Sequence, residues 1–147
     1  RTIVLLESLY AEPTGHVDTF ATFLDAETLV LGSFSPDHDP INARLLDRNA
    51  AILEKVAAKE RLKVVRIPMP DNSDGRWRTY TNVAFVCGGV LVPSYADVDR
   101  RVEEESLALY RRLLPGRRIA PVDCTSLIRG DGALRCITLP VPERRHD

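Results

Sequence analysis

The feature that most constrains this chain is that one order of predicted secondary structure occurs twice. Residues 17–69 and residues 80–123 each read as strand, strand, helix and strand, with little sequence in common. A module of about 50 residues has one apolar sheet face and one helix, and it cannot bury either of them alone. We therefore predict an α/β fold in which such modules stack around a common axis. Two modules leave edges open, so we also expect missing partners.

In the first module, the strand pair is predicted to begin at or before His16 and to end near residue 33. Asp39 is a good helix N-cap and Pro40 a good first helical residue. A strand over residues 62–69 follows the helix. The helix is predicted to bury an apolar stripe formed by Ile41, Leu45, Asn49, Ile52 and Val56, widened by Leu46 and Leu53.

In the second part of the chain, a tight turn is predicted at Gly88-Gly89 and a helix over residues 98–114. A charged tail is predicted at residues 143–147. The side chains predicted to face the core from the helix over residues 98–114 are Val102, Ser106, Leu109 or Tyr110, and Leu113. Strands are predicted over residues 80–87, 90–93, 119–122 and 133–139.

The composition limits the classes of protein. At 147 residues the chain is about one domain, and a net charge of −1 gives no field to attract nucleic acid or an anionic membrane. No run of about 18 apolar residues and no signal peptide is visible. The three cysteines form no CxxC pair, so a disulfide framework is not expected. We expect a reducing, cytoplasmic compartment instead. The chain opens directly on Arg1 and an apolar run, from which we expect a piece of a longer protein or a processed one.

Cys136 is the candidate nucleophile. It follows Arg129-Gly130-Asp131-Gly132 in a predicted strand, so the glycines supply access and Arg135 is a nearby cation. A nucleophilic cysteine needs a lowered pKa, a base and access for the substrate. The alternative is a buried structural cysteine, which is how we interpret Cys87 and Cys124.

His16 is the natural base, because His38 lies in a predicted turn and His146 in the tail. On a strand, His16 and Asp18 at i and i+2 would share a face and act on one ligand. A solvated strand start is the alternative.

Asn82 is the third polar candidate, because an amide within an apolar strand needs hydrogen-bond partners. It is either a site residue or a satisfied structural amide. No metal is expected, because His16, Asp18 and Cys136 have no recognisable ligand spacing and Asp71 and Asp74 do not match a known calcium loop.

Four stretches of the chain, in order and at plausible separations, form one pattern: Glu12–Asp18, Thr79–Asn82, Val90–Pro93 and Gly132–Thr138. Together they resemble the bacterial peptidylarginine deiminase and agmatine deiminase family. The resemblance covers nearly the whole chain, and it implies a pentein-type five-fold propeller of strand-strand-helix-strand modules. Residues 1–147 would then be the C-terminal portion of a guanidine deiminase catalytic domain.

The resemblance implies roles for four residues. Cys136 would be the nucleophile, His16 the general acid/base, Asp18 a carboxylate that binds the guanidinium, and Asn82 a polar residue of the substrate site. The implied reaction hydrolyses a guanidinium group, of agmatine or of peptidyl arginine, to a ureido product and ammonia through a cysteine thiouronium intermediate. No cofactor is implied, and with agmatine as substrate the reaction would belong to putrescine biosynthesis.

Three departures from the family pattern leave alternatives open. Asp131 interrupts a run that is usually glycine, and Arg135 stands where histidine usually precedes the cysteine. The second guanidinium-binding carboxylate of the family comes from the N-terminal half. We therefore expect this chain alone to be inactive and to need its own N-terminal half or a second copy. The alternatives are a non-catalytic binding or scaffold domain and an amidinotransferase.

Overall fold

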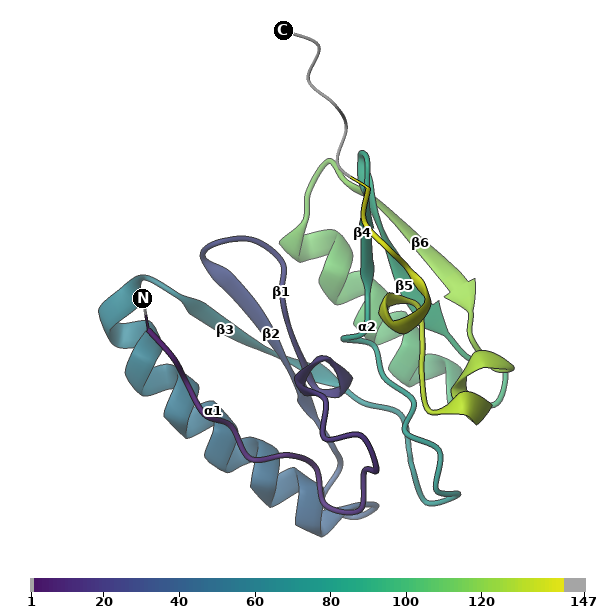
Figure 1. The fold of residues 1–147 in the computed structure, drawn as a ribbon, viewed down its shortest axis with the longest axis horizontal. Coiled ribbons are helices and arrows are strands. Elements are labelled where there is room, and N and C mark those ends of the chain that lie inside the picture. Colours follow the sequence, from purple (N-terminus) through teal and green to yellow (C-terminus); the bar gives the residue numbers. More distant parts are fainter. Residues whose placement is uncertain (1, 142–147) are drawn as a thin grey trace, which may run out of the picture.

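The computed structural model describes residues 2–141, which form two sheets, each backed by one helix (Figure 1). The first module consists of β1 (Ala21–Phe23), β2 (Thr28–Ser33), α1 (Pro40–Glu60) and β3 (Lys63–Pro68). The second module consists of β4 (Ala84–Val86), β5 (Gly89–Ser94), α2 (Arg100–Leu113) and β6 (Arg118–Asp123). The predicted α/β organisation in two modules of the same element order is confirmed.

The two sheets share one topology. In each sheet the first strand pairs antiparallel with the second, and the second pairs parallel with the third across the helix. The central strands β2 and β5 are the most buried, with Val30 and Leu31 on one and Val90 and Val92 on the other all fully buried. No helix among the described residues is long and apolar enough to cross a membrane.

Helix α1 begins where the sequence predicts it. The Asp39 carboxylate accepts a hydrogen bond from the Asn42 backbone nitrogen at 3.0 Å, and Pro40 is the first helical residue. The predicted stripe is wrong at its start, because Ile41 is 54% exposed while Asn42 is buried. The buried face comprises Asn42, Ala43, Leu45, Leu46, Asn49, Ala50 and Leu53.

The buried asparagines of α1 hold the N-terminal segment, which lies along the helix in Figure 1. The Asn49 side chain accepts from the Glu7 backbone nitrogen at 2.9 Å and donates to the Glu7 carbonyl at 2.8 Å. Asn42 binds the two backbone groups of Tyr10 in the same way, at 2.7 and 3.3 Å. The two amides thus satisfy backbone groups that a neighbouring strand would otherwise pair.

A buried arginine joins the two modules. Arg78 is 4% exposed, and its guanidinium donates two 2.9 Å hydrogen bonds to Asp74 and bonds of 2.7 and 3.1 Å to Asp97. These bonds lower the pKa of Asp74 to about 2 and also lower that of Asp97. We call Arg78 with Asp74 and Asp97 the Arg78 clamp, and it fixes the loop after β3 to the loop before α2. In addition, Tyr110 of α2 donates a 2.6 Å hydrogen bond to the Tyr80 carbonyl.

The strand predicted at residues 80–87 is shorter than expected. Only Ala84–Val86 forms β4, and the turn lies at Cys87-Gly88, one residue earlier than predicted. The preceding backbone is held by side chains instead of a neighbouring strand, because the Thr81 nitrogen donates to the Thr79 hydroxyl at 2.9 Å.

The strand predicted at residues 133–139 is wrong. A short 3-10 helix, η3 (Arg135–Ile137), takes its place, with the Ile137 nitrogen bonded to the Leu134 carbonyl at 3.2 Å. Leu134 is buried and Ile137 exposed, so one end of the apolar run anchors the turn. The predicted charged tail at residues 143–147 lies outside the described residues.

Candidate active site

His16 and Asp18 do not lie on a strand, contrary to the prediction. His16 caps a 3-10 helix, η1 (Val17–Thr19), and Asp18 lies within it. The Thr19 hydroxyl donates to the His16 carbonyl at 2.5 Å and so closes the turn. The i and i+2 argument therefore fails for this pair, and their relation depends on the turn.

The loop before His16 is shaped by Glu12. Its carboxylate accepts hydrogen bonds from the Thr14 nitrogen at 3.0 Å and from the Gly15 nitrogen at 2.6 Å. Gly15 has a φ of 65°, which glycine adopts without the steric cost that other residues meet. Glu12 belongs to the stretch that carries the family resemblance, but no role for it was predicted from the sequence.

Asn82 lies at the centre of the candidate site, and its side chain is nearly fully buried. Its amide nitrogen donates to Asp18 Oδ2 at 2.9 Å and lies 3.4 Å from Cys136 Sγ. Its amide oxygen accepts from the Arg135 backbone nitrogen at 2.8 Å. The hydrogen-bonding groups of the Asn82 amide are therefore paired, as a structural amide requires. Two of its partners, Asp18 and Cys136, are themselves candidate site residues.

Cys136 lies in η3 and is exposed. Gly132 permits its position, since a Cβ at residue 132 would lie 3.2 Å from Cys136 Cβ and 3.6 Å from Sγ. Asp131 has a φ of 56°, a left-handed conformation that glycine adopts more easily than any other residue. This accounts for a position at which the family pattern favours glycine.

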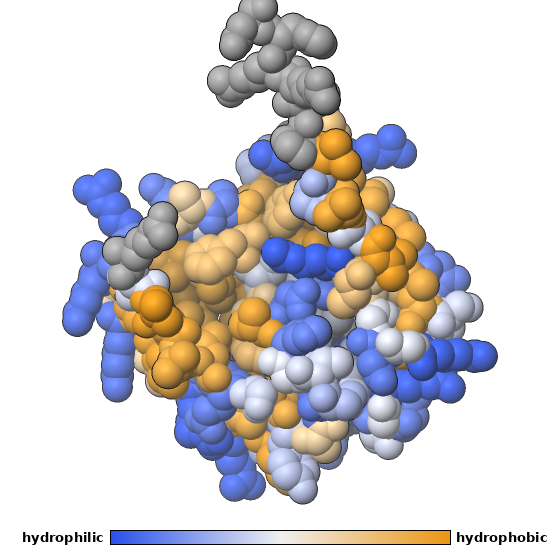
Figure 2. Space-filling model, in the orientation of Figure 1, coloured by the Kyte–Doolittle hydropathy of each residue, from blue (hydrophilic) through white to orange (hydrophobic). Residues whose placement is uncertain are grey.

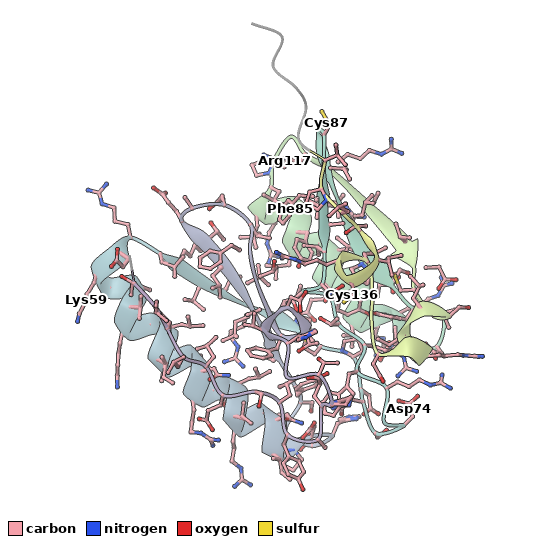
Figure 3. All side chains as sticks on the ribbon, in the orientation of Figure 1. Lys59, Asp74, Phe85, Cys87, Arg117 and Cys136 are labelled. Carbon is pink, nitrogen blue, oxygen red and sulfur yellow. The ribbon has the colours of Figure 1, made fainter. Side chains whose placement is uncertain are left out.

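The other two cysteines differ from each other. Cys124 is fully buried, and burial raises the pKa of its thiol. Cys87 was predicted to be buried but is exposed at the tip of the β4–β5 turn, away from Cys136 (Figure 3). Two exposed thiols are therefore present, and Cys136 is the one that contacts the other candidate residues.

Asn82 separates two hollows of different size. A small cavity of about 10 Å³, close to the least that one water needs, is lined by residues that include Glu12, His16, Trp77, Asn82, Gly132 and Cys136. Trp77 was not predicted to take part, although it is the only tryptophan of the chain. The structure thus brings His16, Asn82 and Cys136 to one cavity.

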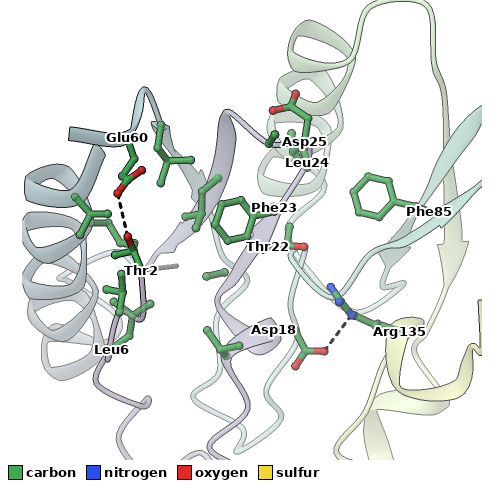
Figure 4. A pocket seen from close by; sticks show the side chains of 18 residues that line it. Thr2, Leu6, Asp18, Thr22, Phe23, Leu24, Asp25, Glu60, Phe85 and Arg135 are labelled. Atoms are coloured by element: carbon green, nitrogen blue, oxygen red, sulfur yellow. Dashed lines mark hydrogen bonds and ion pairs between the residues drawn. The ribbon is translucent and has the colours of Figure 1, made fainter. Parts of the chain in front are cut away.

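The second hollow is a groove of about 980 Å³, lined mainly by the N-terminal segment and the first module and bordered by Phe85 of the second, and Asp18 lies on its wall (Figure 4). Its lining is largely apolar and includes Val4, Leu6, Phe23 and Phe85. Figure 2 shows hydrophobic residues gathered around this hollow. Asp18 thus lines the groove, and its carboxylate also accepts the hydrogen bond from the buried Asn82 amide.

Arg135 also lines the groove. Its Nε lies 3.9 Å from Asp18 Oδ2, and the side chains of Arg135 and Asp18 are 54% and 23% exposed (Figure 4). Among residues 2–141, no three His, Cys, Asp or Glu side chains gather in a way that could hold a metal ion.

Comparisons with known proteins agree on one family. The model of the Porphyromonas-type peptidyl-arginine deiminase family matches residues 1–142. A Streptomyces coelicolor protein, described provisionally as an agmatine deiminase, is 31% identical over 142 residues, covering 87% of this chain and 39% of that protein. The agmatine deiminase of Ectopseudomonas mendocina is 27% identical over 165 residues, covering 95% of this chain and 44% of that protein.

Solved structures give the same result. A Porphyromonas gingivalis protein superposes with a TM-score of 0.81 at 27% identity, over 94% of this chain and 42% of that one. The C. jejuni agmatine deiminase superposes with a TM-score of 0.73 at 25% identity, over 89% of this chain and 39% of that one. The chain thus spans less than half the length of the relatives that it matches. It belongs to the Porphyromonas-type peptidyl-arginine deiminase family.

Proposed function

We propose that the complete protein carrying this chain hydrolyses the guanidinium group of agmatine or of peptidyl arginine to a ureido group and ammonia. The observation that carries the proposal is the Asn82 amide, which touches both the Asp18 carboxylate and the Cys136 thiol. His16 lines the same small cavity as that thiol. A carboxylate, a thiol and an imidazole are the groups that this chemistry needs.

A guanidinium carbon is a weak electrophile because its charge is delocalised, so the group must be held planar while it is attacked. Asp18 would bind the guanidinium nitrogens by charge-assisted hydrogen bonds. The Cys136 thiolate would form a bond to the guanidinium carbon. The C–N bond would then break, and ammonia would leave with a proton from His16.

The planar thiouronium cation left on Cys136 would be hydrolysed in the second half of the reaction. His16 would take a proton from water as the water oxygen bonds to the carbon, and the C–S bond would then break. Overall, guanidinium and water give a ureido group and ammonium. A cavity near the volume of one water suits both the departing ammonia and the entering water.

The remaining length of the protein would complete the site. The chain spans 39% of the Streptomyces coelicolor relative and 44% of the Ectopseudomonas mendocina one, and the large groove exposes apolar side chains beside Asp18. We propose that further modules close a pentein-type propeller over this groove and supply a second carboxylate for the guanidinium. Agmatine as substrate would place the reaction in putrescine formation.

The test uses the complete protein with the variants Cys136→Ser and Cys87→Ser. We expect Cys136→Ser to lose citrulline or carbamoylputrescine formation, and Cys87→Ser to retain it. The two cysteines are a matched pair, because both are exposed thiols and only Cys136 contacts Asn82. Mass spectrometry of the wild-type protein quenched with substrate should locate the adduct on the peptide that contains Cys136. Undiminished turnover by Cys136→Ser would reject the assignment.

A non-catalytic binding or scaffold domain is the second candidate, favoured by the ion pair that already engages Asp18 with Arg135. In that case the complete wild-type protein would release no ammonia from agmatine or from peptidyl arginine.

A further inference from the structure

The carboxylate assigned to the substrate already faces a guanidinium from the chain itself. Arg135 Nε lies 3.9 Å from Asp18 Oδ2, at the wall of the large groove (Figure 4). Asp18 Oδ2 also accepts the Asn82 bond at 2.9 Å, so Asn82 and Arg135 approach the same oxygen. The side chain of Arg135 thus presents to Asp18 the chemical group that a guanidine substrate would present.

We propose that Arg135 is an internal competitor for Asp18, which a guanidine substrate must displace in order to bind. The inference rests on the proposed function, because it assumes that Asp18 binds the substrate guanidinium. Arg135 is then an affinity-determining residue: it lowers the affinity of the site for cationic guanidines without touching the reacting atoms.

The side chain of Arg135 can leave while its backbone stays in place. The Arg135 nitrogen is fixed to Asn82 Oδ1 at 2.8 Å, whereas its side chain is 54% exposed. At 3.9 Å the contact is an ion pair rather than a direct hydrogen bond, since charge-assisted bonds are about 2.7–2.9 Å long. Displacement therefore breaks a weak contact and leaves the connection between Asn82 and η3 intact.

Displacement has a salt signature that a purely structural role would lack. In the wild type, ligand binding exchanges the Arg135–Asp18 pair for a ligand–Asp18 pair, so the number of ion pairs is unchanged. Without Arg135, binding creates a new ion pair, and salt screens it. Removing Arg135 should therefore strengthen the binding of a cation and make that binding more sensitive to salt.

The experiment is calorimetric titration of the complete protein with methylguanidinium and with its neutral analogue methylurea, at low and high salt. We expect Arg135→Gln to bind methylguanidinium about twofold to fivefold more tightly at low salt, the range that an exposed ion pair accounts for. This advantage should shrink at high salt. Arg135→Lys should restore wild-type binding, and methylurea binding should not respond to either substitution.

Two variants serve as controls. Arg129→Gln removes the same charge from an exposed residue of the preceding turn, η2 (Leu127–Gly130), and should leave binding unchanged. In an Asp18→Asn background, Arg135→Gln should no longer tighten methylguanidinium binding. The inference would be overturned if Arg135→Gln did not tighten this binding in the otherwise wild-type protein. It would also be overturned if Arg135→Gln tightened binding equally in the Asp18→Asn background. Because the readout is binding, a protein that turns over no guanidine contradicts the proposed function and leaves this inference standing.

Discussion

At the scale of single residues, one buried amide connects the groups of the candidate site. The Asn82 nitrogen contacts both Asp18 and Cys136, and its oxygen holds the backbone of Arg135. The carboxylate and the thiol are therefore positioned relative to each other through a single side chain. A change that moves Cys136 should be felt at Asp18 as well.

Gly132 gives a direct test of the position of Cys136. In Gly132→Ala the new Cβ would lie 3.2 Å from Cys136 Cβ, closer than most such contacts, so Cys136 must move by a few tenths of an ångström. We expect turnover by the complete protein to fall by up to about tenfold, because small misplacements of reacting groups are costly.

Gly130→Ala is the matched control for that substitution. A Cβ at residue 130 meets no atom within 4 Å, so we expect activity to remain near that of the wild type. Thermal unfolding of both variants would separate misplacement from unfolding. Equal activity of the two variants would contradict a dependence of the site on the position of η3.

At the scale of elements, the sequence predicts those structures that are determined by residues close together in the chain. Asp39 and Pro40 start α1 as expected, because capping depends on a few adjacent positions. The turns that carry His16 and Cys136 could not be predicted, because distant groups hold them. The Arg135 nitrogen bonds to Asn82, 53 residues away, and the Thr81 hydroxyl bonds to the Asp18 carbonyl, 63 residues away. The four candidate residues were chosen from sequence motifs, but their relative positions could not be predicted.

The N-terminal segment depends on α1 through Asn49. In Asn49→Ala, the backbone nitrogen and carbonyl of Glu7 lose their partners, and both hydrogen bonds are partly buried. We expect a loss of about 1–3 kcal/mol in the free energy of unfolding, measured with urea. Hydrogen exchange should accelerate in residues 2–8. Glu54→Ala, on the exposed face of the same helix, should change neither quantity, and equal exchange in both variants would reject the role of Asn49.

The Arg78 clamp predicts a pH dependence. Asp74 has a pKa lowered to about 2, and that of Asp97 is also lowered, so the unfolded chain binds more protons as the pH falls below about 4. The stability that the clamp contributes is present above pH 4 and is lost as the pH falls towards 2. In Arg78→Met the free energy of unfolding should be lower at pH 7 and should fall less steeply between pH 4 and pH 2.

The control for the clamp is Arg129→Met, which removes an exposed cation and should keep the wild-type pH dependence. Urea unfolding at several pH values gives both curves. Parallel curves for Arg78→Met and the wild type would show that the clamp does not set the acid sensitivity.

At the scale of the whole molecule, the apolar groove predicts a covering partner. Phe23 is 54% exposed at the groove, and we expect the further modules proposed above or a second copy to bury it within an interface of at least about 1,000 Å². Phe23→Asp should weaken association of the 147-residue chain with that partner in sedimentation velocity.

Ile41 provides the control, because it is also 54% exposed but lies on α1 and does not line the groove. Ile41→Asp should leave association unchanged. A wild-type chain that sediments as a well-folded monomer and turns over agmatine would contradict both the need for a partner and the need for a second carboxylate.

The position of Trp77 gives the chain an optical probe of its own. The 147 residues contain one tryptophan, and it lines the small cavity together with His16 and Cys136. Its emission therefore reports on the surroundings of the thiol, and no second tryptophan of this chain contributes to it. Alkylation of Cys136 should alter the fluorescence, whereas alkylation of Cys87 should leave it unchanged, so the reaction of Cys136 can be followed in a sample in which Cys87 also reacts.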